Sequence, residues 1–208
     1  MTGTESVDAL DAKLLAAFPG RAVRKDLVHK LKVGFSVPVY VLEYLLGKYC
    51  STADEGEIAA GLQHVKDTIA ERIVRADQVE LVKARLQRTG TARLIDLVTV
   101  TFDETDGAGK YWARLATSGL DRVHVDEKLV HQHERMLTGG VWANLEIAYD
   151  ETMVHGGVTR PFVLQRMQPI QIASARYEEF VAGRQAFTRE EWVDGLMRTI
   201  GYEPTRSS

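Results

Sequence analysis

The stretch VWANLEIAY, residues 141–149, decides the fold class, because apolar and polar residues alternate in it with a period of two. Strict alternation over this length predicts a β-strand with one buried face. One side of the pattern carries Val141, Ala143, Leu145, Ile147 and Tyr149, and the other carries Trp142, Asn144, Glu146 and Ala148. The chain therefore contains a sheet, and the neighbouring segments determine its extent.

Three segments upstream continue this pattern. Residues 110–115 alternate in the same way, and residues 121–125 predict a short strand. In residues 91–102 the apolar positions change phase between Leu97 and Val98. We interpret this change as a β-bulge, which would bend a long strand around a barrel.

The segment between the third and fourth strands predicts a helix. It reads DEKLVHQHERMLTGG over residues 126–140, and Gly139 and Gly140 would end it. A fifth strand is expected near 161–172. Three strands, a helix and two strands follow one another in an OB fold. Residues 91–172 are therefore expected to form a small five-stranded OB-like β-barrel.

The two flanking regions predict helices, which makes the fold class α+β. In residues 1–90 apolar side chains recur at spacings of three and four from Ile58 to Ile73, in a long helix starting near Asp54. A shorter helix is expected over 79–90, and VPVYVLEYLLGKYC (37–50) is expected to be the buried centre of an N-terminal helical bundle. Residues 173–208 predict a helical connector, with a capping box at Thr188–Glu191.

Composition restricts the class of function. The 208 residues include 26 Lys+Arg and 29 Asp+Glu, so the net charge is −3, and any binding of nucleic acid has to be local. No apolar run approaches the ~20 residues of a membrane span. The single cysteine fits a reducing compartment. We expect a cytoplasmic protein with no membrane partner.

A basic stripe in residues 18–32 is the first candidate site. If a helix begins near Arg21, four cationic side chains fall on one of its faces, where they would hold phosphates. They are Arg21, Lys25, His29 and Lys32. The alternative is a solvated face of a surface helix. Arg24 lies nearer the apolar face, and the alternative for it is a structural ion pair.

The outer face of the expected barrel is the second candidate site. Strands two and three would direct outward an aromatic side chain among cationic ones, the usual arrangement for stacking bases and holding phosphates. These residues are Trp112, Arg114, Arg122 and His124. The alternative is that Trp112 packs beneath the helical part and never meets solvent.

No pattern predicts catalysis or a metal site in this chain. His131 and His133 are two residues apart on a helix, so they point in different directions. Cys50 lies in an apolar helix and is expected to be a buried, unreactive thiol. The loops 103–109 and 151–158 occupy the binding-loop positions of an OB-like barrel, and the acidic character of the first disfavours phosphate.

Several segments resemble one known family. They are FPGRAVRKDLVHKLK (18–32), VPVYVLEYLLGKYC (37–50), GGVWANLEIAYD (139–150), RMQPIQ (166–171) and FTREEWVDGLMRTIGYEP (187–204). They resemble the N-terminal region of the BrxL family, the Lon-like AAA+ proteins of BREX phage-defence systems. The resemblance runs from about residue 8 to residue 204.

The resemblance implies a ring-forming, MCM-like ATPase that binds duplex DNA and restricts phage, with a Lon-protease-like C-terminal part. ATP and Mg²⁺ would bind only in an ATPase core absent from this chain, so we expect no cofactor here. The leading hypothesis is a DNA-binding and oligomerisation module without a catalytic site. The alternative is a platform that docks other defence proteins or substrates onto the ring. A stand-alone metal hydrolase would rest on scattered histidines alone.

Overall fold

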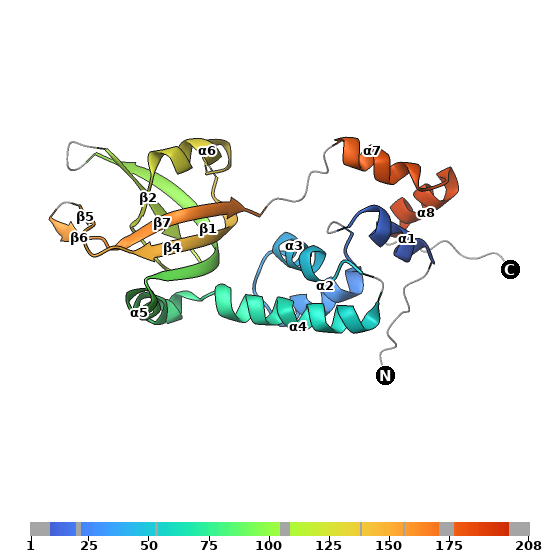
Figure 1. Ribbon diagram of the computed structural model, residues 1–208, viewed down its shortest axis with the longest axis horizontal. Helices are drawn as coiled ribbons and strands as arrows, with labels where there is room; N and C mark the ends of the chain where they lie inside the picture. Colours follow the sequence, from blue (N-terminus) through green and yellow to red (C-terminus); the bar gives the residue numbers. More distant parts are fainter. Residues whose placement is uncertain are drawn as a thin grey trace. The chain divides into compact units, whose positions relative to one another are not determined.

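The computed structural model describes the chain in two compact units (Figure 1). One unit comprises residues 1–65 and 172–208, and the other comprises residues 66–171. The expected divisions lay at residues 90 and 172. The described residues are 9–19, 22–52, 54–104, 109–137, 139–155, 157–170 and 177–199.

The first unit is helical. Its elements are α1 (Ala9–Ala17), α2 (Lys25–Lys32), α3 (Val39–Tyr49), the larger part of α4 (Glu55–Arg72), α7 (Tyr177–Gln185) and α8 (Arg189–Thr199). The central helix predicted over 37–50 is α3, and its Val41, Leu42 and Leu46 are fully buried. Asp54 caps α4 by accepting a hydrogen bond of 2.8 Å from the amide of Glu57.

Two helices from the far end of the sequence pack with α1. The rings of Phe180, Phe187 and Trp192 lie 6.1–6.3 Å from the ring of Phe18. Glu191 of α8 accepts a hydrogen bond of 2.7 Å from Lys13 of α1. Helices α7 and α8 therefore belong to the same compact unit as the N-terminal helices. The predicted capping box is present, with 3.2 Å between the Glu191 amide and the hydroxyl of its partner at position 188.

The second unit is a closed five-stranded barrel with helices around it. Its elements are the 3₁₀ turn η1 (Ala76–Gln78), α5 (Val79–Thr89), β1 (Thr91–Asp103), β2 (Lys110–Leu115), β3 (Val123–Val125), α6 (Glu127–Leu137), β4 (Val141–Tyr149), β5 (Val154–His155), β6 (Val158–Thr159) and β7 (Phe162–Pro169). The barrel strands follow the order β1-β2-β3-β7-β4, and β5 and β6 form a separate two-stranded sheet. The predicted α+β class and the five-stranded barrel are confirmed.

One long strand, β1, closes the barrel. Thr91–Val98 pairs with β4 and Val98–Asp103 pairs with β2, both antiparallel. On the opposite side β3 pairs with β7 in parallel, through His124↔Val163 and Val125↔Leu164. The interior is filled by apolar side chains from every strand, as predicted for 110–115 and 141–149. These include Leu94, Val98, Ala113, Leu115, Val123, Val125, Ala143, Leu145, Ile147, Leu164 and Met167.

The prediction of a β-bulge in residues 91–102 is wrong. The pairing register of β1 runs unbroken from Thr91 to Asp103, and the register shift in the barrel lies instead between β4 and β7, at Glu146/Ile147. Even-numbered residues of β1 from Ala92 to Val100 face the interior. The apolar pattern of the sequence changes phase because the polar residue Asp96 takes an interior position, while its apolar neighbour Ile95 is buried on the other face.

Asp96 holds the turn after β2. Only 1% of this residue is exposed. Its carboxylate accepts hydrogen bonds of 2.7 Å from the amides of Leu97 and Thr117 and one of 2.8 Å from the amide of Ser118. A buried carboxylate is stable when backbone donors surround it in this way. Asp96 therefore ties β1 to the connection between β2 and β3.

We expect Gly61→Ala to destabilise the helical unit. The added methyl group would overlap the carbonyl oxygen of Tyr49 and lie 2.9 Å from the sulfur of Cys50, both at the end of α3. Overpacking of this kind costs about 1–3 kcal/mol. Urea unfolding followed by circular dichroism measures the loss.

Gly195→Ala is the matched control on another helix. A methyl group there would only meet Leu14, at 3.7 Å, which is ordinary contact. Because alanine favours helix over glycine, its stability is expected to rise by about 0.5–1 kcal/mol or stay unchanged. Equal effects of the two substitutions would contradict the close approach of α4 to α3.

Candidate nucleic-acid interface

Helix α2 carries the predicted basic stripe, but it begins later than expected. Arg24 is its N-cap, with an extended backbone (φ −70°, ψ 124°), and the first helical residue is Lys25. Arg21 lies outside the described residues. The stripe on the helix therefore consists of Lys25, His29 and Lys32, which are all exposed.

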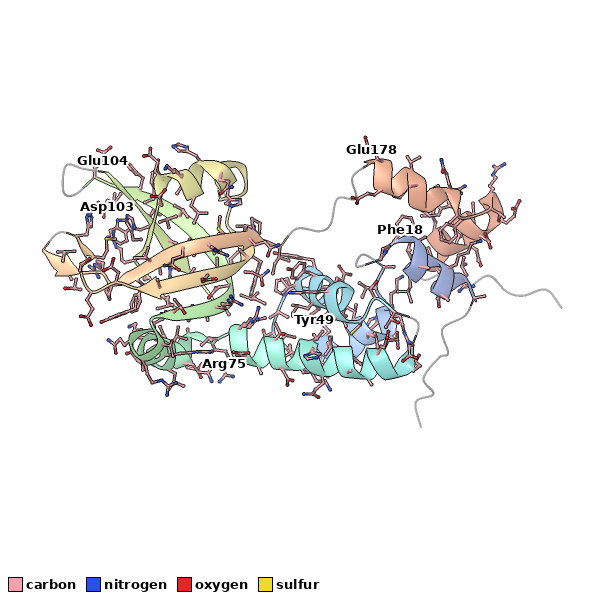
Figure 2. All side chains as sticks on the ribbon, in the orientation of Figure 1. Phe18, Tyr49, Arg75, Asp103, Glu104 and Glu178 are labelled. Carbon is pink, nitrogen blue, oxygen red and sulfur yellow. The ribbon has the colours of Figure 1, made fainter. Side chains whose placement is uncertain are left out.

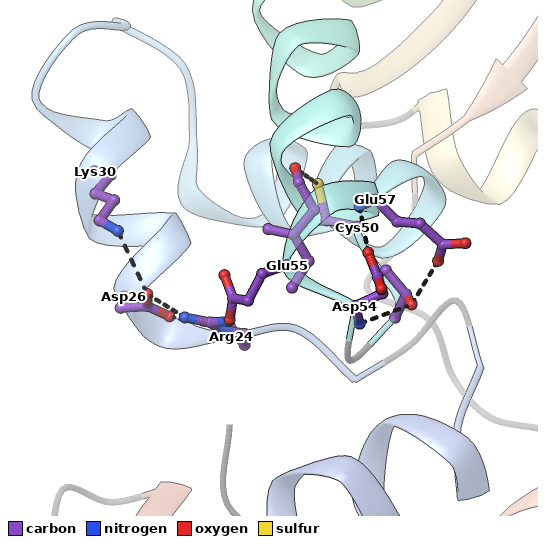
Figure 3. A network of polar contacts seen from close by, with 9 residues as sticks. Arg24, Asp26, Lys30, Cys50, Asp54, Glu55 and Glu57 are labelled. Carbon is purple, nitrogen blue, oxygen red and sulfur yellow. Dashed lines mark hydrogen bonds and ion pairs between the residues drawn. The ribbon is translucent and has the colours of Figure 1, made fainter. Parts of the chain in front are cut away.

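Arg24 is engaged in a structural ion pair, as expected from its position. Its Nε and Nη2 atoms donate to the carboxylate of Asp26, at 3.0 and 2.9 Å, and its Nη1 donates to that of Glu55 at 2.6 Å (Figure 3). Hydrogen bonding to Asp26 raises the pKa of Arg24 further above its ordinary value against the effect of burial. Burial disfavours the charged form of Asp26, but hydrogen bonds from Arg24 lower its pKa overall. This network fixes the start of α2 against α4.

Lys25 is held by the far end of α8. Its ammonium donates to the carbonyl oxygens of Arg198 and Thr199, and the first of these bonds is 2.9 Å long. A cation at the start of a helix opposes that helix's dipole, whereas a cation at the end of a helix is stabilised by it. The charge of Lys25 is therefore favourable at the C-terminal end of α8 and unfavourable at the start of α2. His29 and Lys32 are left as the stripe residues that face solvent.

The outer face of β2 and β3 carries the second predicted set, arranged around Trp112. Trp112 pairs with Thr101 of β1 and with His124 of β3. Its side chain points away from the barrel interior, as predicted, but only 2% of the residue is exposed. The alternative expectation that Trp112 does not meet solvent is therefore confirmed.

A small arm formed by β5 and β6 covers this tryptophan. The imidazole of His155 lies 4.9 Å from the indole of Trp112, ring centre to ring centre, with 48° between the planes. Its Nε2 atom is 3.6 Å from the carboxylate of Asp103 at the end of β1 (Figure 2). The ammonium of Lys110 donates to the carbonyl of Val154 at 3.3 Å.

Arg122 completes the cluster from the start of β3. Its guanidinium bonds Asp103 at 2.6 Å and lies 5.9 Å from the centre of the Trp112 ring. The backbone of Arg122 has φ 56°, which glycine adopts far more easily than arginine. Among the described residues it is the only one other than glycine in this region. The turn into β3 therefore accepts local strain and sets a cation beside the indole.

Two polar atoms on this face lack a partner among the described residues. They are the indole Nε1 of Trp112 and the imidazole Nδ1 of His124, and both atoms are buried. A buried donor or acceptor left unsatisfied costs about 1–3 kcal/mol. Burial, with smaller contributions from Lys110 and His155, lowers the pKa of His124 below its ordinary value, against the influence of Asp126.

Arg114 is the predicted residue that remains open to solvent on the barrel. It is exposed on β2, two residues beyond the tryptophan and paired with Thr99 of β1. The cluster also contains His155, Lys110 and Asp103, which the sequence pattern did not predict. A signal for the arm was available, since two glycines stand at 156–157 between short β-branched segments, as in a tight hairpin.

The residues considered for metal binding do not cluster. His131 is exposed on α6 and lies 3.4 Å from Glu127, while His133 is half-buried. Within the described ranges no three His, Cys, Asp or Glu side chains are placed to hold a metal ion. Cys50 is buried, as expected, and burial raises the pKa of its thiol. In the same ranges no helix is both long and apolar enough to cross a membrane.

Two family profiles match the chain. The profile described as the BREX system Lon protease-like protein BrxL N-terminal region matches residues 16–149. The chain belongs to the BrxL family. A second profile, the ATPase domain of Lon-like protease BrxL-like proteins, matches residues 162–208. The match to the BrxL ATPase profile includes β7, α7 and α8, so the segment expected to be only a connector carries sequence of that domain.

Two curated BrxL relatives cover almost the whole chain. The Lon-like protease BrxL of Escherichia coli O9:H4 (strain HS) is 40% identical over 195 residues, which is 94% of this chain and 28% of the relative. The Lon-like protease BrxL of Bacillus cereus (strain H3081.97) is 38% identical over 200 residues, 96% of this chain and 29% of the relative. The chain spans less than a third of the length of these relatives.

We expect the barrel to lose stability as the pH falls below about 6.5, the ordinary pKa of histidine, partly because of His124. A histidine whose pKa is lowered by folding takes up a proton more readily when unfolded, so acid favours the unfolded chain. The folded protein therefore keeps its full stability above the ordinary pKa of histidine, about 6.5. It loses stability as the pH falls from there through the lower pKa that His124 has in the folded protein. His124→Gln removes this contribution.

The measurement is the urea midpoint of both proteins at pH 7.5 and pH 5.5. The decrease between the two pH values is expected to be smaller for His124→Gln than for the wild type. Carboxylates contribute equally to both proteins and cancel in the comparison. Equal decreases would show that His124 titrates normally in the folded chain.

Proposed function

We propose that this chain is the DNA-binding and oligomerisation module of a BREX phage-restriction AAA+ ATPase, and that it carries no catalytic site of its own. Duplex DNA is the proposed ligand, and a ring of identical subunits is the proposed assembly. The membership of the BrxL family supports the defence role. The fold and the surface of the barrel support the binding role.

The observation that carries the proposal is the cationic and aromatic outer face of β2 and β3. Arg114 is exposed there, and Arg122 lies beside the indole of Trp112. Small closed barrels with this strand order use the same face, as OB folds do, to bind oligonucleotides. Phosphates would interact with the guanidinium groups, and the acidic remainder of the surface would keep the contact local.

Helix α2 is the proposed second contact. His29 and Lys32 are exposed on one side of it, and the buried Leu27 and Leu31 face the other way. Since Lys25 is bonded to the end of α8, a phosphate on α2 would be held mainly by the two residues nearer its C-terminus. This contact is therefore weaker than the stripe of four residues expected from the sequence.

The role of the full-length protein is a further part of the proposal. We propose an MCM-like ring whose ATPase part binds ATP and Mg²⁺ outside the residues of this chain, with a Lon-protease-like C-terminal part and a cytoplasmic location. The match of residues 162–208 to the ATPase profile supports a direct continuation into that part.

A docking platform for other defence proteins is the second candidate function. Among the described residues of the second unit, three large apolar side chains are about half exposed: Phe102 at the end of β1, and Val154 and Val158 on the arm. Exposed apolar clusters are typical of protein contacts. A partner recovered with the full chain after nuclease treatment, and lost on Val154→Ser with Val158→Ser, would favour this function.

We expect Arg114→Glu and Lys32→Glu, made separately, to weaken binding of the full chain to labelled duplex DNA. Each lost phosphate contact reduces the slope of log K against log salt by about 0.9. Binding is measured by fluorescence anisotropy across a salt series from about 50 to 200 mM. The variant with the larger change in slope identifies the main contact.

Arg88→Glu is the matched control. Arg88 is exposed on α5 and belongs to neither candidate face, while the change in net charge is the same. Its slope is expected to equal that of the wild type. No binding by the folded wild-type chain at low salt would contradict the proposed function, and equal losses in all three variants would contradict the assignment of the faces.

A further inference from the structure

The arm is a small element joined to the ends of β4 and β7, and His155 is the one buried residue among those of the arm that the structure describes. Its strands β5 and β6 contribute two residues each and pair only with each other, through Val154↔Thr159 and His155↔Val158. Gly157 at its turn has φ 72°. In Figure 1 the arm projects beyond the ends of β4 and β7. Segments with so few buried contacts open more readily than the barrel they cover.

The contacts of the arm with the barrel centre on one side chain. His155 is the buried residue of the arm, and its imidazole lies against the indole of Trp112. The 3.6 Å separation from Asp103 and the 3.3 Å bond from Lys110 to the arm are both long. The imidazole of His155, on the short arm, therefore lies against the indole of Trp112 on β2.

The covered surface has the chemistry to receive another ring. The indole Nε1 of Trp112 and the Nδ1 of His124 lack partners within the described part of the chain, although both atoms are buried. The ring nitrogens and carbonyl oxygens of a nucleobase would supply partners for them. Bases also stack on tryptophan whatever their identity, because every base has a π-face.

Cationic groups surround the same surface. Arg122 lies 5.9 Å from the centre of the indole, Lys110 bonds the arm, and Arg114 is exposed two residues along β2. An uncharged aromatic ligand would form no ion pair with these cations. A nucleotide, whose base stacks while its phosphates meet guanidinium and ammonium groups, uses the whole arrangement.

We propose that the outer face of β2 and β3 beneath the β5–β6 arm is a seat for one unpaired nucleobase, which His155 covers until a strand displaces the arm. The proposal rests on the proposed function, since it names the site and the part of the nucleic acid recognised. Duplex phosphates would bring the chain to DNA, and the seat would then favour a strand whose bases are exposed.

The test compares two oligonucleotides that differ only in their bases. Oligo-dT of twelve nucleotides and an abasic strand of the same length carry the same phosphates. The full chain is titrated with each at two salt concentrations, and tryptophan fluorescence is recorded with anisotropy of the labelled strand. We expect tighter binding of oligo-dT, by roughly five- to a hundred-fold for one stacked base. Quenching of tryptophan fluorescence is expected with oligo-dT alone.

Two substitutions assign the effect to the seat. Trp112→Leu is expected to remove the preference for oligo-dT and to leave binding of the abasic strand unchanged. His155→Ala leaves the tryptophan in place and uncovers it, so oligo-dT is expected to bind more tightly than to the wild type. His131→Ala is the matched control, because it removes an exposed imidazole from α6 in the same unit. Circular dichroism checks that each variant is folded.

The outcomes separate this proposal from the proposed function. Equal affinity of the wild type for oligo-dT and the abasic strand would overturn the nucleobase seat while leaving phosphate binding intact. No binding of either strand or of duplex would overturn both. If Trp112→Leu fails to fold, His155→Ala decides alone, and an affinity for oligo-dT that is unchanged or lower overturns the proposal.

Discussion

The barrel depends on a single strand that is shared between its two sides. The thirteen residues of β1 pair with β4 along the first part and with β2 along the second, and Val98 takes part in both pairings. Such a strand has to curve, and its interior positions have to alternate without interruption. The two hydrogen bonds that Asp96 accepts from the amides of Thr117 and Ser118 keep the turn after β2 against this strand. The parallel pairing of β3 with β7 then completes the closure.

The same strand determines where the candidate site lies. Its last residues place Thr101 beside Trp112, and Asp103 at its end is within reach of both Arg122 and His155. Asp103 neutralises Arg122 and lies near His155 of the arm. This carboxylate therefore links the closed barrel to the arm. The positive charge on this face is therefore partly balanced, which agrees with a chain of net charge −3.

Local patterns in the sequence predicted the elements well. The alternation in 141–149 and 110–115 identified strands whose interior residues are those of the core. The apolar spacing starting at Ile58 identified α4, and the capping box identified the start of α8. These features depend on neighbours within a few residues, so periodicity and capping rules capture them.

The errors arose where a distant segment decides the outcome. The sequence around Asp96 predicted a bulge because two of the amides that bond its buried carboxylate, those of Thr117 and Ser118, lie outside the strand. The burial of Trp112 depends on an arm that begins forty residues later, and the partner of Lys25 is the end of α8. The packing of α1 with α7 and α8 likewise joins opposite ends of the sequence. Spacing within one element carries no information about such contacts.

The central claim is that nucleic acid binds this chain on the outer face of β2 and β3. Hydrogen–deuterium exchange of the full chain, with and without a duplex carrying a single-stranded overhang, tests it most directly. The account predicts slower exchange in residues 110–125 when DNA is bound, together with faster exchange in the arm at 153–160. Binding that leaves both segments unchanged would contradict it.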